Sequence, residues 1–306
     1  MYYFQDKKLF LQTLHPAAVM AYTGIVIFLA LACSHPFCLI SLYLVLLLLV
    51  GLADGFSAYK KYFWLMAIML LMILLVNPLF NKLGSTVLLT GPALPVLGRF
   101  TLTLEALLYG LNMGVRLMVV MTVFFLYNHL MNPDRAFSFM ARFAPGSVML
   151  ITLTTRLIPY LAVQFRNIKE VQQTRGVKFN QPGPAGKIKS YYPLLKVLLL
   201  SSLENAFNVA EAIQSRAYGS GPRSYYTREK IQPRDIIVLA ASLSAFVGGV
   251  VLLAKGMAGY QFYPQLGTPF IKAEQLTIMA LISLFLALPA FLNWGWKYWP
   301  YLKWKI

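Results

Sequence analysis

Seven apolar stretches of near-bilayer length constrain this chain more than any other feature. A helix needs about 20 predominantly apolar residues to cross the hydrocarbon core of a membrane. Stretches of this kind lie at residues 17–33, 37–53, 62–80, 106–127, 147–164, 235–254 and 275–293. Because 58% of the residues are hydrophobic and only 12% are charged, the sequence predicts an all-α integral membrane protein.

The distribution of lysine and arginine predicts how the chain is oriented, because cytoplasmic connections are enriched in both. Residues 166–234 contain twelve basic and four acidic side chains, so this stretch is predicted to be cytoplasmic. With a cytoplasmic N-terminus, four spans bring the chain back inside at Arg135, and a fifth span at 147–164 would place the basic stretch outside. Arg156 and Pro159 also lie in the middle of that segment, where both are unfavourable in a lipid-exposed helix. We therefore expect residues 147–164 to lie against the cytoplasmic side.

This count predicts about six transmembrane helices and a cytoplasmic module of two to three helices. Residues 1–128 hold four spans, residues 129–232 form the module and residues 233–306 hold two more spans, with both termini cytoplasmic. Seven spans remain the alternative, since the charge rule has exceptions. The net charge is +17, and the basic residues lie between apolar runs. We therefore expect these residues to interact with anionic membrane lipid and to set the orientation of the chain, and we expect no nucleic acid partner.

The module is expected to contain helices at residues 133–143, 147–175 and 191–218, with a proline- and glycine-rich loop at 180–186. Gly176 and Gly219 are expected to close the two long helices in the left-handed conformation. Along the last helix, apolar and small residues recur at steps of three and four, which predicts a seam for close packing against another helix. This seam consists of Leu195, Leu199, Ser202, Ala206, Val209 and Ile213.

Two matching helix ends, 41 residues apart, are the strongest functional signal. Each places an arginine between small residues, and the two sequences are Thr174-Arg175-Gly176 and Ser215-Arg216-Ala217. A cation in the last turn complements the helix dipole, so one such end alone is best explained as ordinary capping. Two of them on consecutive helices of one cytoplasmic module favour docking points for a partner, because a guanidinium can bind several acceptors at once.

The sequence offers no catalytic site. Its acidic residues are scattered singly, and no phosphate-binding loop with the required spacing is present, so a non-enzymatic protein without a cofactor is predicted. Cys33, His35 and Cys38 form a small cluster that is compatible with a metal site or a disulfide. An ordinary loop is favoured over both, because three residues with this spacing are a weak signal, and no metal site is predicted.

Several motifs together resemble the transmembrane T component of energy-coupling factor (ECF) transporters, a family that includes cobalt- and nickel-transport membrane subunits. The resemblance covers about residues 1–255 in order and spacing. Besides the two helix ends, it rests on Asn77-Pro78-Leu79-Phe80, on Thr103-Leu104-Glu105-Ala106-Leu107 with Arg116 later, and on Thr154-Thr155-Arg156-Leu157-Ile158-Pro159-Tyr160-Leu161. The last apolar run, 275–293, lies beyond the usual pattern and is interpreted as an added membrane helix.

The resemblance implies a membrane scaffold in a bacterial or archaeal cell membrane. Arg175 and Arg216 match the two signature arginines, each of which docks on one of two cytoplasmic ABC ATPases in that family. Their motion is passed to a substrate-binding S component, which releases a vitamin or a metal ion. Thr174, Ser215 and Ala217 depart from the Ala-Arg-Gly signature, although all three are small. Ala217 is less free than glycine to turn the chain, and Gly219 is an alternative position for that turn.

Two other functions remain open. A permease subunit of a conventional ABC importer would use one coupling loop near Glu211-Ala212 and Gly219, rather than two helix ends. A membrane-embedded enzyme acting on lipid-linked substrates would need clustered carboxylates or histidines, and the sequence does not contain such a cluster.

Overall fold

The computed structural model forms two compact units, which are residues Met1–Arg135 with Lys230–Ile306, and residues Ala136–Glu229. It describes residues 10–81, 84–94, 98–141, 143–177, 179, 183–221, 231–267 and 272–298. The predicted cytoplasmic positions of the two termini concern residues 1–9 and 299–306, which lie outside this range. The predicted boundaries after residues 128 and 232 concern membrane position and remain predictions.

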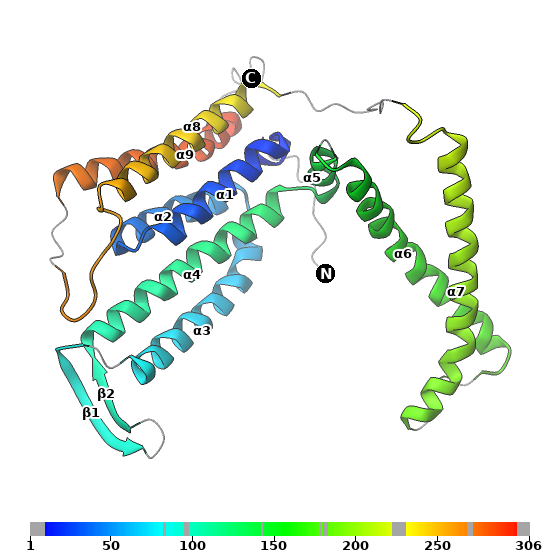
Figure 1. The fold of residues 1–306 in the computed structure, drawn as a ribbon, viewed down its shortest axis with the longest axis horizontal. Helices are drawn as coiled ribbons and strands as arrows, with labels where there is room; N and C mark the ends of the chain where they lie inside the picture. The colour runs from blue at the N-terminus through cyan, green and yellow to red at the C-terminus, as the bar shows by residue number, and fades with distance from the viewer. Residues whose placement is uncertain are drawn as a thin grey trace. The chain divides into compact units, whose positions relative to one another are not determined.

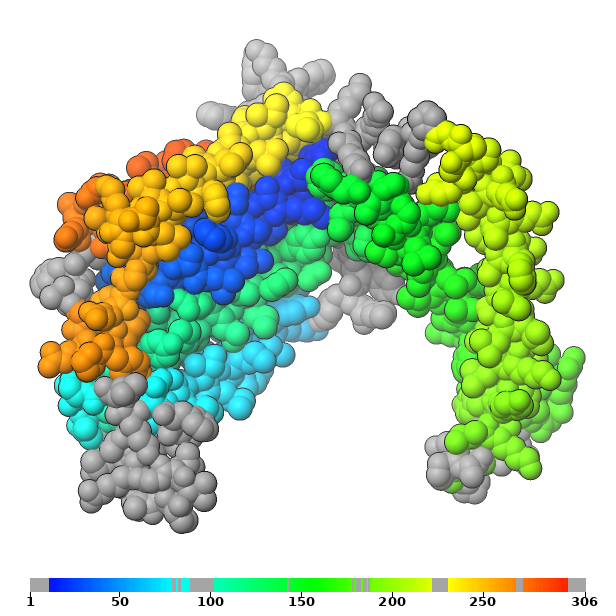
Figure 2. Space-filling model, viewed as in Figure 1, coloured from blue at the N-terminus to red at the C-terminus, as the bar shows by residue number. Residues whose placement is uncertain are grey.

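The first unit is a helical bundle (Figure 1). A 3-10 helix, η1 (Phe10–Thr13), precedes α1 (Pro16–Ala32), α2 (Pro36–Leu52), α3 (Phe56–Phe80), α4 (Leu104–Leu130), α8 (Pro233–Ala254) and α9 (Ala273–Tyr298). α1 packs on α4 and α8, α2 packs on α4 and α9, and α3 packs mainly on α4. Large aliphatic side chains that are almost completely buried fill the centre, among them Leu29, Leu39, Leu42, Leu126 and Leu286. The first four helices form one continuous block (Figure 2).

Small residues allow α3 and α4 to approach closely. A Cβ atom added at Gly114 would lie 2.9 Å from Cγ of Leu70, and one added at Gly110 would lie 3.2 Å from Nδ2 of Asn77. Asn77 Nδ2 donates a 2.6 Å hydrogen bond to the carbonyl oxygen of Ala106, which satisfies a polar group inside the bundle. The opposite face of α3 is exposed and apolar, and includes Trp64, Leu71 and Leu75.

The helices have the composition of a membrane protein, which confirms the predicted fold class. Within the part of the chain that the structure describes, five helices are long and apolar enough to cross a membrane by length and composition, and they are Phe56–Pro78, Leu104–Leu130, Pro145–Thr174, Pro233–Ala254 and Ala273–Trp296. α1 and α2 are apolar and have 17 residues each, near the lower limit for a span. These two helices and the four long ones of the first unit correspond to the six predicted spans. Whether Pro145–Thr174 crosses stays a prediction.

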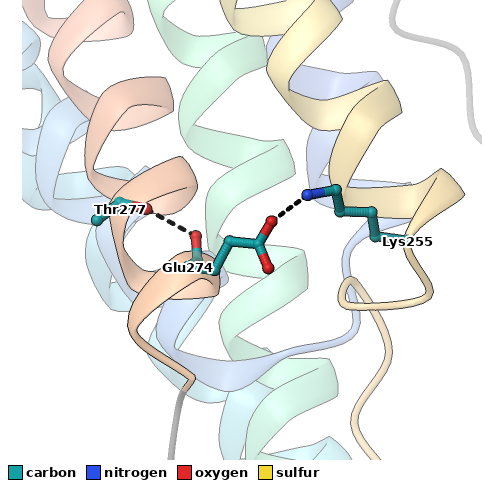
Figure 3. Close-up of polar contacts among 3 residues, drawn as sticks. All are labelled: Lys255, Glu274 and Thr277. Carbon is teal, nitrogen blue, oxygen red and sulfur yellow. Dashed lines mark hydrogen bonds and ion pairs between the residues drawn. The ribbon is translucent and has the colours of Figure 1, made fainter.

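The loop between α8 and α9 is held at its base by an ion pair. Lys255 Nζ and Glu274 Oε1 join the two helix ends, and Thr277 Oγ1 donates a 2.8 Å hydrogen bond to the carbonyl oxygen of Glu274 (Figure 3). Both charged side chains are about half exposed, so water screens the pair and its contribution to stability is small.

A β-hairpin that the sequence analysis did not predict connects α3 to α4. β1 (Val87–Leu94) pairs with β2 (Gly98–Thr103) in antiparallel register, with Val87 opposite Thr103 and Leu94 opposite Gly98. Buried Glu105 anchors the hairpin: its Oε1 accepts hydrogen bonds from the Thr86 hydroxyl at 2.7 Å and from the Thr86 amide at 3.0 Å. The carboxylate also lies at the N-terminus of α4, where negative charge is favourable.

The second unit is a pair of long helices, α6 (Pro145–Thr174) and α7 (Pro184–Ser215), preceded by α5 (Pro133–Met140), which begins in the first unit. α6 and α7 cross (Figure 1). At the contact, the ring of Tyr191 stacks on Phe165 with 6.4 Å between centroids and lies 5.1 Å from the ring of Phe179. Leu194 is completely buried beside them. These side chains hold α6 and α7 together.

The helix predicted at residues 191–218 is wrong at both ends, since α7 ends at Ser215 and Ala217, not Gly219, takes the left-handed position that closes it. α7 begins at Pro184, seven residues before the predicted start at 191, so it takes over the end of the predicted loop at 180–186. Proline is well tolerated at the first position of a helix, because the N–H group that it lacks has no partner there. The helix then continues through Pro193, as α6 continues through Pro159. The remaining loop residues 180–182 lie outside the described range.

Candidate functional site

The first of the two helix ends is a complete Schellman motif. Arg175 is the C-cap residue, with φ −81° and ψ 8°, and Gly176 follows in the left-handed conformation with φ +85°. The Gly176 amide donates to the carbonyl oxygen of Gln173 at 3.0 Å, and the Val177 amide donates to that of Gln172 at 3.1 Å. These two bonds satisfy carbonyl groups that the end of a helix otherwise leaves without a partner. The predicted role of Gly176 is confirmed.

The second end repeats this geometry at the equivalent positions. Arg216 is the C-cap residue with φ −82° and ψ 8°, and Ala217 follows with φ +53°. The Ala217 amide donates to the carbonyl oxygen of Gln214 at 2.9 Å, and the Tyr218 amide donates to that of Ile213 at 3.3 Å. The turn therefore occurs at Ala217 itself, at a steric cost of about 1–2 kcal/mol for a residue with a Cβ atom. The second left-handed residue, Gly219, lies two positions later with φ +92°.

The hydroxyl groups before the two arginines also have equivalent partners. Thr174 Oγ1 donates to the carbonyl oxygen of Val171 at 2.8 Å, and Ser215 Oγ donates to that of Ala212 at 3.1 Å. A hydroxyl that bonds back to its own helix satisfies a carbonyl in the last turn and stays close to the backbone. Threonine or serine in place of alanine therefore adds little bulk to the helix ends.

All six residues of the two ends are exposed. Among the residues that the structure describes, neither Arg175 nor Arg216 forms a hydrogen bond or an ion pair through its guanidinium group. The sequence analysis grouped these residues, and the structure gives both groups the same backbone conformation and the same hydrogen bonds. Each end presents a guanidinium on a short turn that two backbone hydrogen bonds close. Such a group can bind carboxylates or carbonyl oxygens of a partner.

The predicted packing seam of α7 is mostly open to solvent in this chain. Leu195 and Leu199 are 49% and 68% exposed, Ala206 and Val209 are exposed, and Ser202 and Ile213 are half-buried. The contact with α6 instead uses the neighbouring face, which carries Ser190, Tyr191 and Leu194. This face begins at Ser190, before the predicted helix start at 191, so the sequence analysis did not consider it. The packing role of the seam stays a prediction.

Other residues of the resembling motifs hold the bundle together. Arg116 Nη2 on α4 donates to the carbonyl oxygen of Cys33 at 3.0 Å and to Ser34 Oγ at 3.1 Å, so it secures the turn between α1 and α2. Asn77 and Glu105 secure α3 and the β-hairpin in the same manner. These three polar residues therefore have a structural role in the bundle, which accounts for their place in the resembling motifs.

Cys33 and Cys38 are both buried free thiols at the same turn. His35, 5% exposed, packs its ring edge-on against Tyr260 at 5.4 Å, and burial lowers the pKa of its imidazole. Within the described ranges, no group of three or more His, Cys, Asp or Glu side chains is placed to hold a metal ion.

Comparison with known proteins gives the family. The profile of the CbiQ family, described as cobalt transport protein, matches residues 8–226. The chain belongs to this family. The matched range contains both helix ends and stops before α8, so the family pattern includes the candidate site. The chain is therefore a multi-pass membrane protein of a transport family.

Individual relatives share shorter segments with the chain. It is 33% identical over 94 residues to the energy-coupling factor transporter transmembrane protein EcfT of Lactococcus lactis, and 34% identical over 92 residues to that of Staphylococcus aureus. Each alignment covers 30% of this chain and about a third of the relative, 35% and 34% respectively. The protein of the same name from Acidaminococcus fermentans is 28% identical over 131 residues, which are 40% of this chain and 49% of the relative.

Proposed function

We propose that this protein is the transmembrane scaffold subunit of an ECF-type importer. It couples ATP hydrolysis by two cytoplasmic ABC ATPases to the uptake of a vitamin or a metal ion, which a separate S component binds. It performs no catalysis itself. The supporting observation is the pair of helix ends with the same backbone conformation, the same hydrogen bonds and an exposed arginine each.

The chemistry of the two ends supports a docking role. A planar guanidinium on a rigid turn presents its donors in a fixed direction, which suits a pocket of carboxylates and carbonyl oxygens on a partner. One chain with two equivalent ends offers one docking point to each of two ATPases. A permease of a conventional ABC importer would present a single coupling element, so the duplication favours the scaffold. The membrane orientation that follows places residues 129–232 and both termini in the cytoplasm.

The decisive experiment reverses the charge at one helix end. We expect Arg216→Glu to abolish co-purification of the two ATPases and to abolish uptake, because a carboxylate repels the acceptors that bind the guanidinium. Since Arg216 is exposed and has no polar partner among the described residues, the variant should purify as a monodisperse membrane protein with an unchanged melting temperature. The ATPases are identified by mass spectrometry of the wild-type pull-down.

Arg166→Glu is the matched control, because Arg166 is an exposed arginine of α6 that lies more than two turns before the helix end. This control should retain the ATPases. Arg175→Ala alone should weaken uptake more than assembly, because the second end still docks. Normal ATPase recovery with Arg216→Glu would reject the proposed function.

A further inference from the structure

The segment between η1 and α1 is bound by side chains from two distant parts of the chain. We call residues 12–15, where the chain turns from η1 into α1, the elbow. A short helix leaves its last carbonyl groups without partners inside the helix, and these groups carry partial negative charge. The elbow contains the last two residues of η1 and the two that follow, so its carbonyl oxygens need donors from elsewhere in the fold.

Arg135 supplies two of these donors. Its Nη1 atom donates to the carbonyl oxygen of Gln12 at 2.7 Å, and its Nη2 atom donates to that of Leu14 at 3.1 Å. A single guanidinium thus binds two carbonyl groups of the elbow. Hydrogen bonds from a charged donor are stronger than neutral ones, and two from one planar group also fix its orientation.

The first turn of α8 binds two further backbone groups of the elbow. Arg234 Nη2 donates to the carbonyl oxygen of Thr13 at 3.4 Å, and the Arg234 guanidinium lies 5.8 Å from the ring of Trp296. Asp235 Oδ1 accepts a 2.8 Å hydrogen bond from the amide of His15. Arg234 and Asp235 are 8% and 2% exposed, so these contacts are shielded from water.

The two arginines that bind the elbow lie next to the points where the chain leaves the first unit and returns to it. Arg135 is the last residue of the first unit before the chain continues into the second, and Arg234 lies four residues after it returns at Lys230. Residues next to both boundaries of the first unit therefore bind the same four-residue elbow. All of these contacts lie within the first unit, on the bundle side of the two connections.

The apolar side of the elbow faces a small unfilled space. Leu11 and Leu14 are 2% and 4% exposed, and they line an apolar cavity of about 30 Å³ together with Val19, Leu46 and Val123. The side chains that line such a cavity have fewer packing partners than those of a filled core. Gln12, Leu14 and His15 are nevertheless buried, so the elbow is enclosed by the bundle as well as held at its carbonyl groups.

We propose that the elbow transmits movement of the second unit to the membrane bundle, with Arg135 and Arg234 as positioning residues. This inference rests on the proposed function, since the ATPases supply the movement. When the second unit moves, it displaces the chain next to Arg135 and Arg234 and thereby moves both guanidinium groups. Because both groups bind residues 12–15, the start of α1 shifts with them. The arginines bind backbone carbonyl groups, so the movement is passed on without a change in any side-chain rotamer of the elbow.

The test replaces both arginines by glutamine and separates transport from ATP hydrolysis. In reconstituted complexes, Arg135→Gln/Arg234→Gln should retain the ATPases and their ATP hydrolysis, while uptake falls about tenfold, which corresponds to the loss of about one charge-assisted hydrogen bond. Hydrogen exchange at the amides of His15, Ala17 and Ala18 should respond to ATP in the wild-type complex and not in the double variant. Arg166→Gln removes an exposed arginine that belongs to the second unit and should leave uptake unchanged.

The outcomes separate the two proposals. A wild-type chain that captures no ATPases rejects the proposed function, whereas normal uptake by the double variant in an intact complex rejects the elbow. Loss of the ATPases from the double variant alone also rejects it, because the arginines would then serve assembly. If the glutamine variant does not fold, Arg135→Lys/Arg234→Lys decides. Each lysine keeps the charge and at least one donor, so uptake should be intermediate, and uptake equal to the wild type overturns the proposal.

Discussion

Exchanging glycine and alanine between the two helix ends should change their stability in opposite directions. Gly176 and Ala217 occupy the same position of two otherwise equivalent Schellman motifs, with φ +85° and φ +53°. An alanine in the left-handed conformation costs about 1–2 kcal/mol, whereas glycine costs about 0.5–1 kcal/mol more than alanine in lost chain entropy. The balance favours glycine by about 0.5–1 kcal/mol, so Ala217→Gly should stabilise the second end and Gly176→Ala should destabilise the first.

Hydrogen exchange measures this difference directly. The amides of Ala217 and Tyr218 close the second motif, so their exchange reports its opening. After correction for the intrinsic rates of the altered sequence, about 0.5–1 kcal/mol corresponds to exchange that is about two- to fivefold slower in Ala217→Gly. The amides of Gly176 and Val177 should exchange about two- to fivefold faster in Gly176→Ala.

Ala212→Gly provides the matched control for this experiment. Ala212 is an exposed residue in the last turns of α7, where glycine is unfavourable, so the same substitution there should speed up exchange. Faster exchange in both Ala217→Gly and Ala212→Gly would refute the reasoning, because it would mean that the left-handed conformation of Ala217 costs less than the added freedom of glycine.

Two further substitutions test the first unit. Because burial lowers the pKa of His35 below the free value of 6.5, the unfolded chain binds the proton more readily, and stability should fall as the pH drops below about 6.5 and be constant above it. Thermal unfolding in detergent at about pH 7.5 and about pH 5.5 should show a smaller difference for His35→Gln than for the wild type, and an equal difference would contradict the assignment. Gly84→Ala should destabilise the protein by about 1–3 kcal/mol, since the new Cβ atom would lie 2.6 Å from Thr103 Oγ1 and crowd the Glu105 carboxylate. An unchanged melting temperature for Gly84→Ala would show that the anchor of the β-hairpin can relax.

The sequence predicted the helices well because their signal is local. Length and apolar content alone located every long helix of the bundle, and Gly176 marked the end of α6. The start of α7 was misplaced because proline at 184 begins a helix, while the same residue type at 193 lies inside it. The β-hairpin was missed because residues 85–103 mix apolar, glycine and proline residues without a clear alternation.

The candidate site was predictable to a similar extent. Thr174-Arg175-Gly176 and Ser215-Arg216-Ala217 could be paired by their composition and spacing, although the left-handed conformation of Ala217 could not be read from an alanine. The elbow had no sequence signal. Its contacts join side chains to backbone carbonyl groups 121 and 221 residues away, and Arg135 and Arg234 appeared in the sequence only as charges that set the membrane orientation. Long-range contacts to backbone groups leave no residue pattern to recognise.

The close match of the two helix ends limits how a partner can tell them apart. Their arginines have the same position and their turns the same hydrogen bonds, so the proposed ATPase docking would not distinguish the two ends through these groups. Any preference for two different ATPases has to come from the flanking positions. There the chain is unequal: Val177 follows the first turn and Tyr218, 47% exposed, follows the second. Valine adds little beyond bulk, whereas the tyrosine ring adds a flat apolar surface and a hydroxyl group. The asymmetry of such an assembly would therefore reside in the residue next to the turn and not in the arginine.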